Sequence, residues 1–208
     1  ELVKDGAIGE VRKVEAWYPQ GWLATKLEAE GQKQASWRVD PGKAGASGCG
    51  GDIGTHAYEF VRFVAGRQAT RIRGRLKAFV PGRALDDDFT VLAELDNGGI
   101  ATITASQITI GAQNDNGFRV IGDKGRVEWS MLDHMSLYLY RGGEPVQQGG
   151  EQRPVGRGEP DLLTMQLPLQ DGGSRTAGLD ALDQHRPLRR VEGDFEVAPL
   201  GGRAISRR

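Results

Sequence analysis

Gly66 separates two different hydrophobic periods in this chain. Before it, apolar residues recur at the spacing of an α-helix and form one stripe. The stripe consists of Ile53, Ala57, Phe60, Val61 and Val64. This pattern predicts an amphipathic helix from about Asp52 to Val64, with Gly66 as its C-terminal stop signal.

After Gly66 the period changes to two, which is the period of a β-strand. Asn97-Gly98 lies between two β-rich runs and is a strong hairpin signal. The predicted strands cover residues 70–78, 89–95, 100–106, 118–122, 126–129 and 135–140, and residues 10–20 form an earlier one. The predicted fold class is therefore α+β, with a mostly antiparallel, open-faced β-sheet and the helix packed on one face. Such a sheet leaves its other face uncovered, and we expect an apolar face that mediates a homo-oligomer.

Composition limits the partners and the compartment. The 208 residues include 27 basic and 28 acidic side chains, so the chain lacks the basic excess typical of nucleic-acid binding. No apolar run approaches the length that crosses a membrane, and no signal peptide is visible. A single cysteine, Cys49, excludes an internal disulfide framework and favours a cytoplasmic location.

Asp52 and His56 are the main candidates for chemistry. They lie four residues apart, so their side chains project from neighbouring turns of one helix face. A carboxylate and an imidazole in this arrangement could form a proton-transfer pair. The alternative is structural, with Asp52 as a helix cap and His56 as a packing residue beside the apolar stripe.

Other groups allow two interpretations each. Tyr18, Trp22 and Trp37 precede the helix and could stack on a sugar ring or pack in the core. Arg38 and Asp40 could bind hydroxyl groups or pair with each other at the surface.

Two further clusters contain residue types that can bind metal ions. Residues 86–88, three consecutive aspartates, are interpreted as a solvated turn, although acidic clusters can bind hard cations. A metal site formed by Cys49, Asp52 and His56 is not expected, because no fourth ligand has a familiar spacing.

Several motifs resemble the C-terminal domain of the glucose-fructose oxidoreductase and inositol dehydrogenase (Gfo/Idh/MocA) family, over about residues 1–145. They are Gly6-Ala7-Ile8-Gly9-Glu10-Val11, Trp37-Arg38, Gly50-Gly51-Asp52-Ile53-Gly54-Thr55-His56, Leu95-Asp96-Asn97-Gly98-Gly99 and Val120-Ile121-Gly122-Asp123-Lys124-Gly125-Arg126-Val127. The stretch Tyr18, Gln20, Gly21 and Trp22 is similar to members that act on sugars and cyclic polyols.

The resemblance implies an NAD(P)-dependent oxidoreductase that acts on a sugar or polyol hydroxyl. It places the proton acceptor on His56 and a substrate-positioning or supporting role on Asp52. The candidate substrate-binding residues are Tyr18, Gln20, Trp22, Trp37 and Arg38. The family's lysine, from a Glu-Lys-Pro motif, has no counterpart, and Lys43 is a weak substitute.

The nucleotide-binding half of such an enzyme has no counterpart in these residues. No strand is followed by Gly-x-Gly-x-x-Gly, and the glycine-rich segment 45–51 does not follow a buried strand. We therefore expect the N-terminal Rossmann domain to be absent, so that the chain alone binds neither NAD nor NADP and is inactive. The alternative is a stand-alone, non-catalytic module for sugar binding or assembly.

The expected domain division places the substrate-binding sheet domain in residues 1–148 and an irregular tail in 149–208. The chain starts at Glu1, and residues 1–9 are typical of internal sequence, which favours a piece of a longer protein. The family continues past its sheet with another helix, whereas Pro187 would interrupt a helix here. We interpret the tail from near residue 165 as poorly ordered or as the product of a shifted reading frame.

Overall fold

The computed structural model describes residues 1–143 in full and the backbone of 163–164 and 193–197. One nine-stranded sheet has the order β8-β7-β6-β5-β1-β4-β3-β2-β9. Its strands are β1 (Val11–Pro19), β2 (Ala69–Lys77), β3 (Asp88–Leu95), β4 (Ile100–Ser106), β5 (Gly117–Gly122), β6 (Gly125–Ser130), β7 (Ser136–Arg141), β8 (Leu163–Thr164) and β9 (Gly193–Val197). The helical segments are η1 (Leu27–Glu30), α1 (Lys33–Arg38), α2 (Pro41–Ala44), η2 (Gly50–Gly54), α3 (Thr55–Phe63) and η3 (Met131–Asp133).

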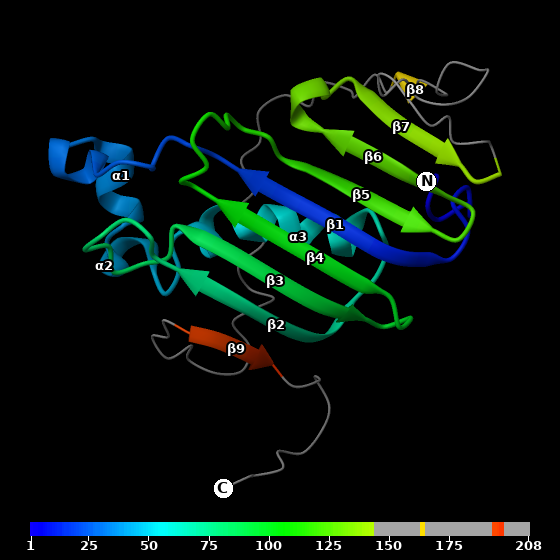
Figure 1. Ribbon diagram of the computed structural model, residues 1–208, viewed down its shortest axis with the longest axis horizontal. Coiled ribbons are helices and arrows are strands. Elements are labelled where there is room, and N and C mark those ends of the chain that lie inside the picture. Colours follow the sequence, from blue (N-terminus) through cyan, green and yellow to red (C-terminus); the bar gives the residue numbers. More distant parts are fainter. Residues whose placement is uncertain (144–162, 165–192, 198–208) are drawn as a thin grey trace, which may run out of the picture.

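The α3 helix covers one face of the sheet and packs on β1, β4 and β5, as Figure 1 shows. The predicted stripe points into the core. Ala57 and Val61 are fully buried there, and Phe60 and Val64 pack at its edge. Gly66 has the positive φ of 63° that a C-terminal glycine provides, so the predicted helix and its stop signal are confirmed.

The predicted hairpins are confirmed, but the sheet is mixed. β3 pairs antiparallel with β4 around the Asn97-Gly98 turn, and β5 pairs antiparallel with β6. The strand β1 lies between β5 and β4 and runs parallel to β4, with Pro19 opposite Ser106 at the end of the ladder. The mostly antiparallel sheet was predicted from hairpins between consecutive strands. The parallel pair was missed because β1 and β4 are far apart in the sequence.

The open face of the sheet is mixed, with a charged cluster around Arg119 and the exposed side chains of Leu92 and Ile100, so the prediction of an apolar face holds only in part. Arg119 pairs with Glu15 at 3.5 Å and with Glu128 at 2.9 Å, and its guanidinium lies 5.2 Å from the ring centre of Trp17. These side chains alternate along their strands with buried ones, so they occupy the face opposite α3. Assembly through this face remains a prediction.

Most of the predicted tail lies outside the described residues. Within it, β8 pairs with β7 and β9 pairs with β2, both antiparallel. The division at residue 148 and the interpretation of a shifted reading frame stay predictions. Among the residues that the structure describes, no helix is long and apolar enough to cross a membrane.

Candidate active site

A cavity of about 890 Å³ opens beside the C-terminal ends of β1 and β4. The parallel pairing of these strands places the segment after Pro19 next to the segment after Ser106. The cavity is lined by Tyr18, Gln20, Gly21, Trp22, Gln32, Gln34, Arg38, Asp52, Ile53, His56, Gly111, Ala112, Gln113 and Asn114. The structure thus brings together six of the seven predicted site residues, and Trp37 is outside this lining.

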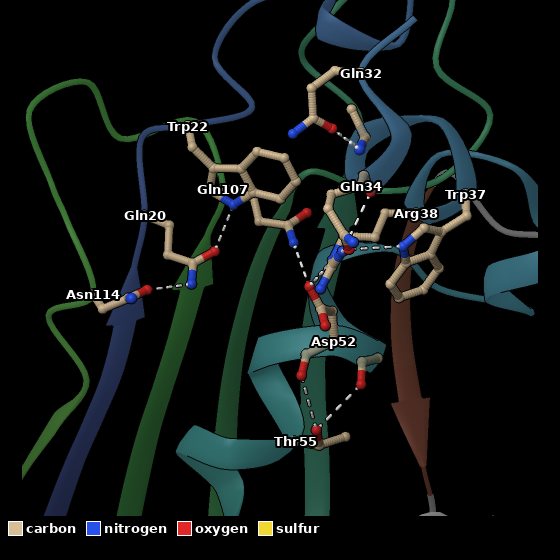
Figure 2. Close-up of polar contacts among 12 residues, drawn as sticks. Gln20, Trp22, Gln32, Gln34, Trp37, Arg38, Asp52, Thr55, Gln107 and Asn114 are labelled. Carbon is tan, nitrogen blue, oxygen red and sulfur yellow. Dashed lines mark hydrogen bonds and ion pairs between the residues drawn. The ribbon is translucent and has the colours of Figure 1, made fainter.

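The Asp52 carboxylate is held by two donors that reach the same oxygen. Arg38 Nε and Gln107 Nε2 each lie 2.8 Å from Asp52 Oδ2, and Figure 2 shows both side chains converging on it. Within the described part of the chain, no group donates a hydrogen bond to Oδ1. Asp52 is therefore anchored through Oδ2.

His56 presents an accessible imidazole to the cavity. Its ring is exposed and makes an edge-on contact with Tyr18, with 6.0 Å between ring centres. In the described residues it has no hydrogen-bond partner, so the packing alternative from the sequence does not hold. An accessible imidazole one turn from an anchored carboxylate can accept a proton from a bound hydroxyl group.

Two glycines explain how the start of this helix sits so close to the sheet. The segment Gly50–Gly54 is a π-helix that leads directly into α3. A Cβ on Gly50 would lie 2.9 Å from side-chain atoms of Leu76 and Phe89, and one on Gly54 would lie 3.1 Å from Phe89. π-Helical turns occur frequently at functional sites, and this one carries Asp52.

Arg38 is fixed between aromatic rings. Its guanidinium lies 4.1 Å from the ring centre of Trp37 and 5.5 Å from that of Trp22. Gln34 Oε1 accepts hydrogen bonds from both Arg38 Nη1 and Trp37 Nε1. Trp37 therefore supports Arg38. The predicted Arg38–Asp40 surface pair does not form, because Asp40 pairs with Lys43 instead.

Amide side chains dominate the opposite wall of the cavity. Gln20 Nε2 donates to Asn114 Oδ1 at 2.6 Å, and Trp22 Nε1 donates to Gln20 Oε1 at 2.9 Å. Sequence reasoning missed Asn114 and Gln107. Both follow β4, and only knowledge of the parallel β1–β4 pairing could have placed Asn114 in the cavity wall and Gln107 against Asp52.

The acidic run 86–88 forms part of the internal scaffold, so its interpretation as a solvated turn is wrong. Asp86 accepts hydrogen bonds from Ser47 Oγ and from the backbone N–H groups of Gly48 and Gly50. Its carboxylate thereby fixes the loop that precedes the π-helix. These amide groups are already occupied by Asp86, so they do not form a phosphate-binding loop.

Asp87 is 1% exposed and binds the backbone N–H groups of Phe79 and Val80 and the guanidinium of Arg83. The side chain of Arg83, only 2% exposed, also pairs with Glu28 and donates to the carbonyl groups of Leu23 and Thr25. This buried cluster ties the loop after β1 to the loop before β3.

Cys49 is buried, and burial together with the nearby aspartate charges raises the pKa of its thiol. It is therefore not a nucleophile at neutral pH. In the part of the chain that the structure describes, no group of three or more potential ligands is placed to hold a metal ion.

The family model described as the GFO/IDH/MocA C-terminal domain matches residues 1–128. The chain belongs to this family. It is 33% identical over 153 residues to an uncharacterised oxidoreductase of Bacillus subtilis, YfiI, and the match covers 70% of this chain and 38% of that protein.

Solved structures agree with this family assignment. An inositol dehydrogenase homologue from Azotobacter vinelandii, complexed with NAD+, shares 32% identity with a TM-score of 0.65 and covers 70% of this chain and 38% of its own. A second structure from that organism, complexed with NADH and myo-inositol, shares 28% identity with a TM-score of 0.61, over 70% of this chain and 36% of its own. The chain therefore spans less than two fifths of the length of these Gfo/Idh/MocA relatives.

Proposed function

We propose that this chain is the substrate-binding and catalytic-base half of an NAD(P)-dependent sugar or cyclic-polyol dehydrogenase. The observation that carries the proposal is the placement of Asp52 and His56 on one wall of the cavity, in a Gfo/Idh/MocA domain. Support for the substrate class comes from the myo-inositol complex of the similar Azotobacter structure.

In this proposal His56 takes the proton from the hydroxyl group that is oxidised. The free Oδ1 of Asp52 accepts a hydrogen bond from a ligand hydroxyl and so orients the sugar ring toward His56. Because Arg38 pairs with Asp52, the two charges offset each other, which favours a neutral ligand. Tyr18, Gln20 and Trp22 would bind the rest of the polyol.

The cofactor does not fit the described residues. The backbone amides of Gly48 and Gly50 are engaged by Asp86, and no other glycine-rich turn joins a strand to a helix in these parts of the chain. NAD(P), which accepts a hydride in dehydrogenases of this kind, would have to be held by a separate Rossmann domain. We therefore propose that the chain alone is inactive and binds neither NAD nor NADP.

Assembly through the open sheet face is part of the same proposal. Its row of arginine, glutamate and aromatic side chains suits a polar homo-oligomeric contact. A second candidate function, a non-catalytic module for sugar binding or assembly, shares the cavity but does not require His56.

Replacing His56 distinguishes the two functions. The variant His56→Ala would be compared with the wild type after each is joined to the dinucleotide-binding domain encoded upstream, if one is encoded there. We expect turnover at saturating polyol to fall by about 10²–10⁴-fold, the usual contribution of a general base. Unchanged turnover, or an upstream sequence without a Rossmann domain, would favour the non-catalytic module.

A further inference from the structure

Gln107 is a buried polar residue whose side chain reaches the candidate catalytic carboxylate. It is 2% exposed, and its Nε2 lies 2.8 Å from Asp52 Oδ2. It directly follows β4, and Figure 2 shows its amide and the Arg38 guanidinium meeting at the same oxygen of Asp52. Burying an amide is unfavourable unless it is hydrogen-bonded, so an apolar residue would suit a purely packing position better.

The backbone of Gln107 is fixed on both sides. Its N–H group donates to the carbonyl oxygen of Asp87 at 2.9 Å, and its own carbonyl accepts from the N–H of Leu23 at 3.0 Å. Asp87 and Leu23 belong to the two loops that the buried Arg83 joins. The scaffold beneath the cavity therefore fixes the backbone from which the Gln107 side chain extends.

Two donors on one oxygen restrict a carboxylate more than either donor alone. With Arg38 as its only partner, Asp52 could rotate about the bond to its carboxylate while keeping the ion pair. The second donor, Gln107, approaches Oδ2 from another element and removes that freedom. Donor groups held by a rigid scaffold avoid the free energy of reorganisation when a ligand binds.

We propose that Gln107 is a positioning residue that, together with Arg38, fixes the Asp52 carboxylate so that Oδ1 faces the cavity and accepts a ligand hydroxyl. The role of Oδ1 rests on the proposed function. The orientation of Asp52 by Gln107 does not, because it concerns this chain without any ligand.

Two substitutions separate positioning from packing. Gln107→Met keeps a similar length and volume but has no donor, whereas Gln107→Glu keeps the shape and places an acceptor against Asp52. Gln68→Met serves as a matched control, since within the described residues that exposed glutamine is hydrogen-bonded only through its backbone. Crystal structures of the 208-residue variants would show the Asp52 side chain, and calorimetry with myo-inositol would measure binding.

We expect the Asp52 carboxylate to rotate in Gln107→Met and to turn away from residue 107 in Gln107→Glu. The affinity for myo-inositol should fall by about tenfold in the first and further in the second, while Gln68→Met matches the wild type.

An Asp52 side chain that keeps its orientation in both Gln107 variants would overturn the inference, whatever the ligand result. If the wild type binds no polyol, the proposed function fails, but the crystal structures still decide the role of Gln107. If the wild type binds, Asp52→Ala does not, and Gln107→Met binds as tightly as the wild type, only the inference fails.

Discussion

Arg38 and Asp52 form a partly buried ion pair that joins the end of α1 to the π-helix. Arg38 Nε lies 2.8 Å from Asp52 Oδ2, and the two side chains are 22% and 27% exposed. The pair therefore connects the segment that carries Trp22 and Trp37 to the helix that carries the proposed base.

Replacing Arg38 should weaken polyol binding. Arg38→Met removes the Nε donor and leaves the Asp52 charge without its pair, so the affinity of the 208-residue chain for myo-inositol should fall by about tenfold or more. Arg38→Lys keeps the charge but loses the planar group that stacks on Trp37, and we expect an intermediate loss. Calorimetry would measure the affinity of both variants.

Arg62→Met is the control, because Arg62 pairs with Glu59 on the exposed side of α3. Equal losses in all three variants would contradict the prediction.

Removing Asp87 should destabilise the fold. Asp87→Ala leaves two backbone N–H groups without their acceptor and removes one of the carboxylates that neutralise the buried Arg83. Breaking a buried ion pair from one side typically costs about 3–5 kcal/mol in the free energy of unfolding. Urea denaturation would measure this cost.

The control is Asp5→Ala, at an exposed aspartate near the N-terminus. It should change the free energy of unfolding by less than about 0.5 kcal/mol. An equal loss of unfolding free energy in both variants would show that the buried cluster around Asp87 does not stabilise the fold more than an exposed aspartate does.

Asp88 should make stability depend on pH. Burial raises the pKa of its carboxyl group, the charges of Asp87 and Asp86 add to the rise, and a hydrogen bond from Ser106 opposes it. The unfolded chain then releases this proton at lower pH than the folded one, so the group costs stability as pH rises above its ordinary pKa.

The variant Asp88→Asn should therefore unfold at higher urea concentration than the wild type at pH 7. This difference in urea midpoint should shrink toward pH 4, where a larger fraction of the folded wild type has a protonated Asp88. Urea denaturation at several pH values between these limits would test this. If Asp88→Asn raises the urea midpoint by the same amount at every pH, the charge of Asp88 is not the cause of the stabilisation.

The Cys49 thiol should be unreactive in the folded protein. It is fully buried, and its raised pKa keeps it protonated through neutral and mildly alkaline pH. At pH 8, a thiol reagent such as dithionitrobenzoate should modify it only after denaturant is added. Rapid modification of the native chain would show that the loop around Cys49 opens readily.

The elements that depend on local pattern could be predicted from the sequence. The helix before Gly66 and the hairpin at Asn97-Gly98 follow from hydrophobic period and turn chemistry, which act over a few residues. The placement of Asp52 and His56 one helical turn apart, facing the same cavity, follows from the same local geometry. Because local chemistry sets these features, the sequence also determined which end of the helix would carry the candidate site.

The rest of the site depends on contacts between distant segments. An alternating strand such as β1 has the same pattern in a parallel or an antiparallel pair, so the sequence could not place Pro19 opposite Ser106. The chain that follows β4 then brings Gln107 to Asp52 and Asn114 to Gln20 at the cavity. Similarly, nothing local separates a solvated acidic turn from the partly buried Asp86, whose donors come from the loop before the π-helix, or from the buried Asp87, which is tied through Arg83 to the loop after β1. Tertiary structure decided these features, because burial and hydrogen-bond partners are properties of the assembled fold.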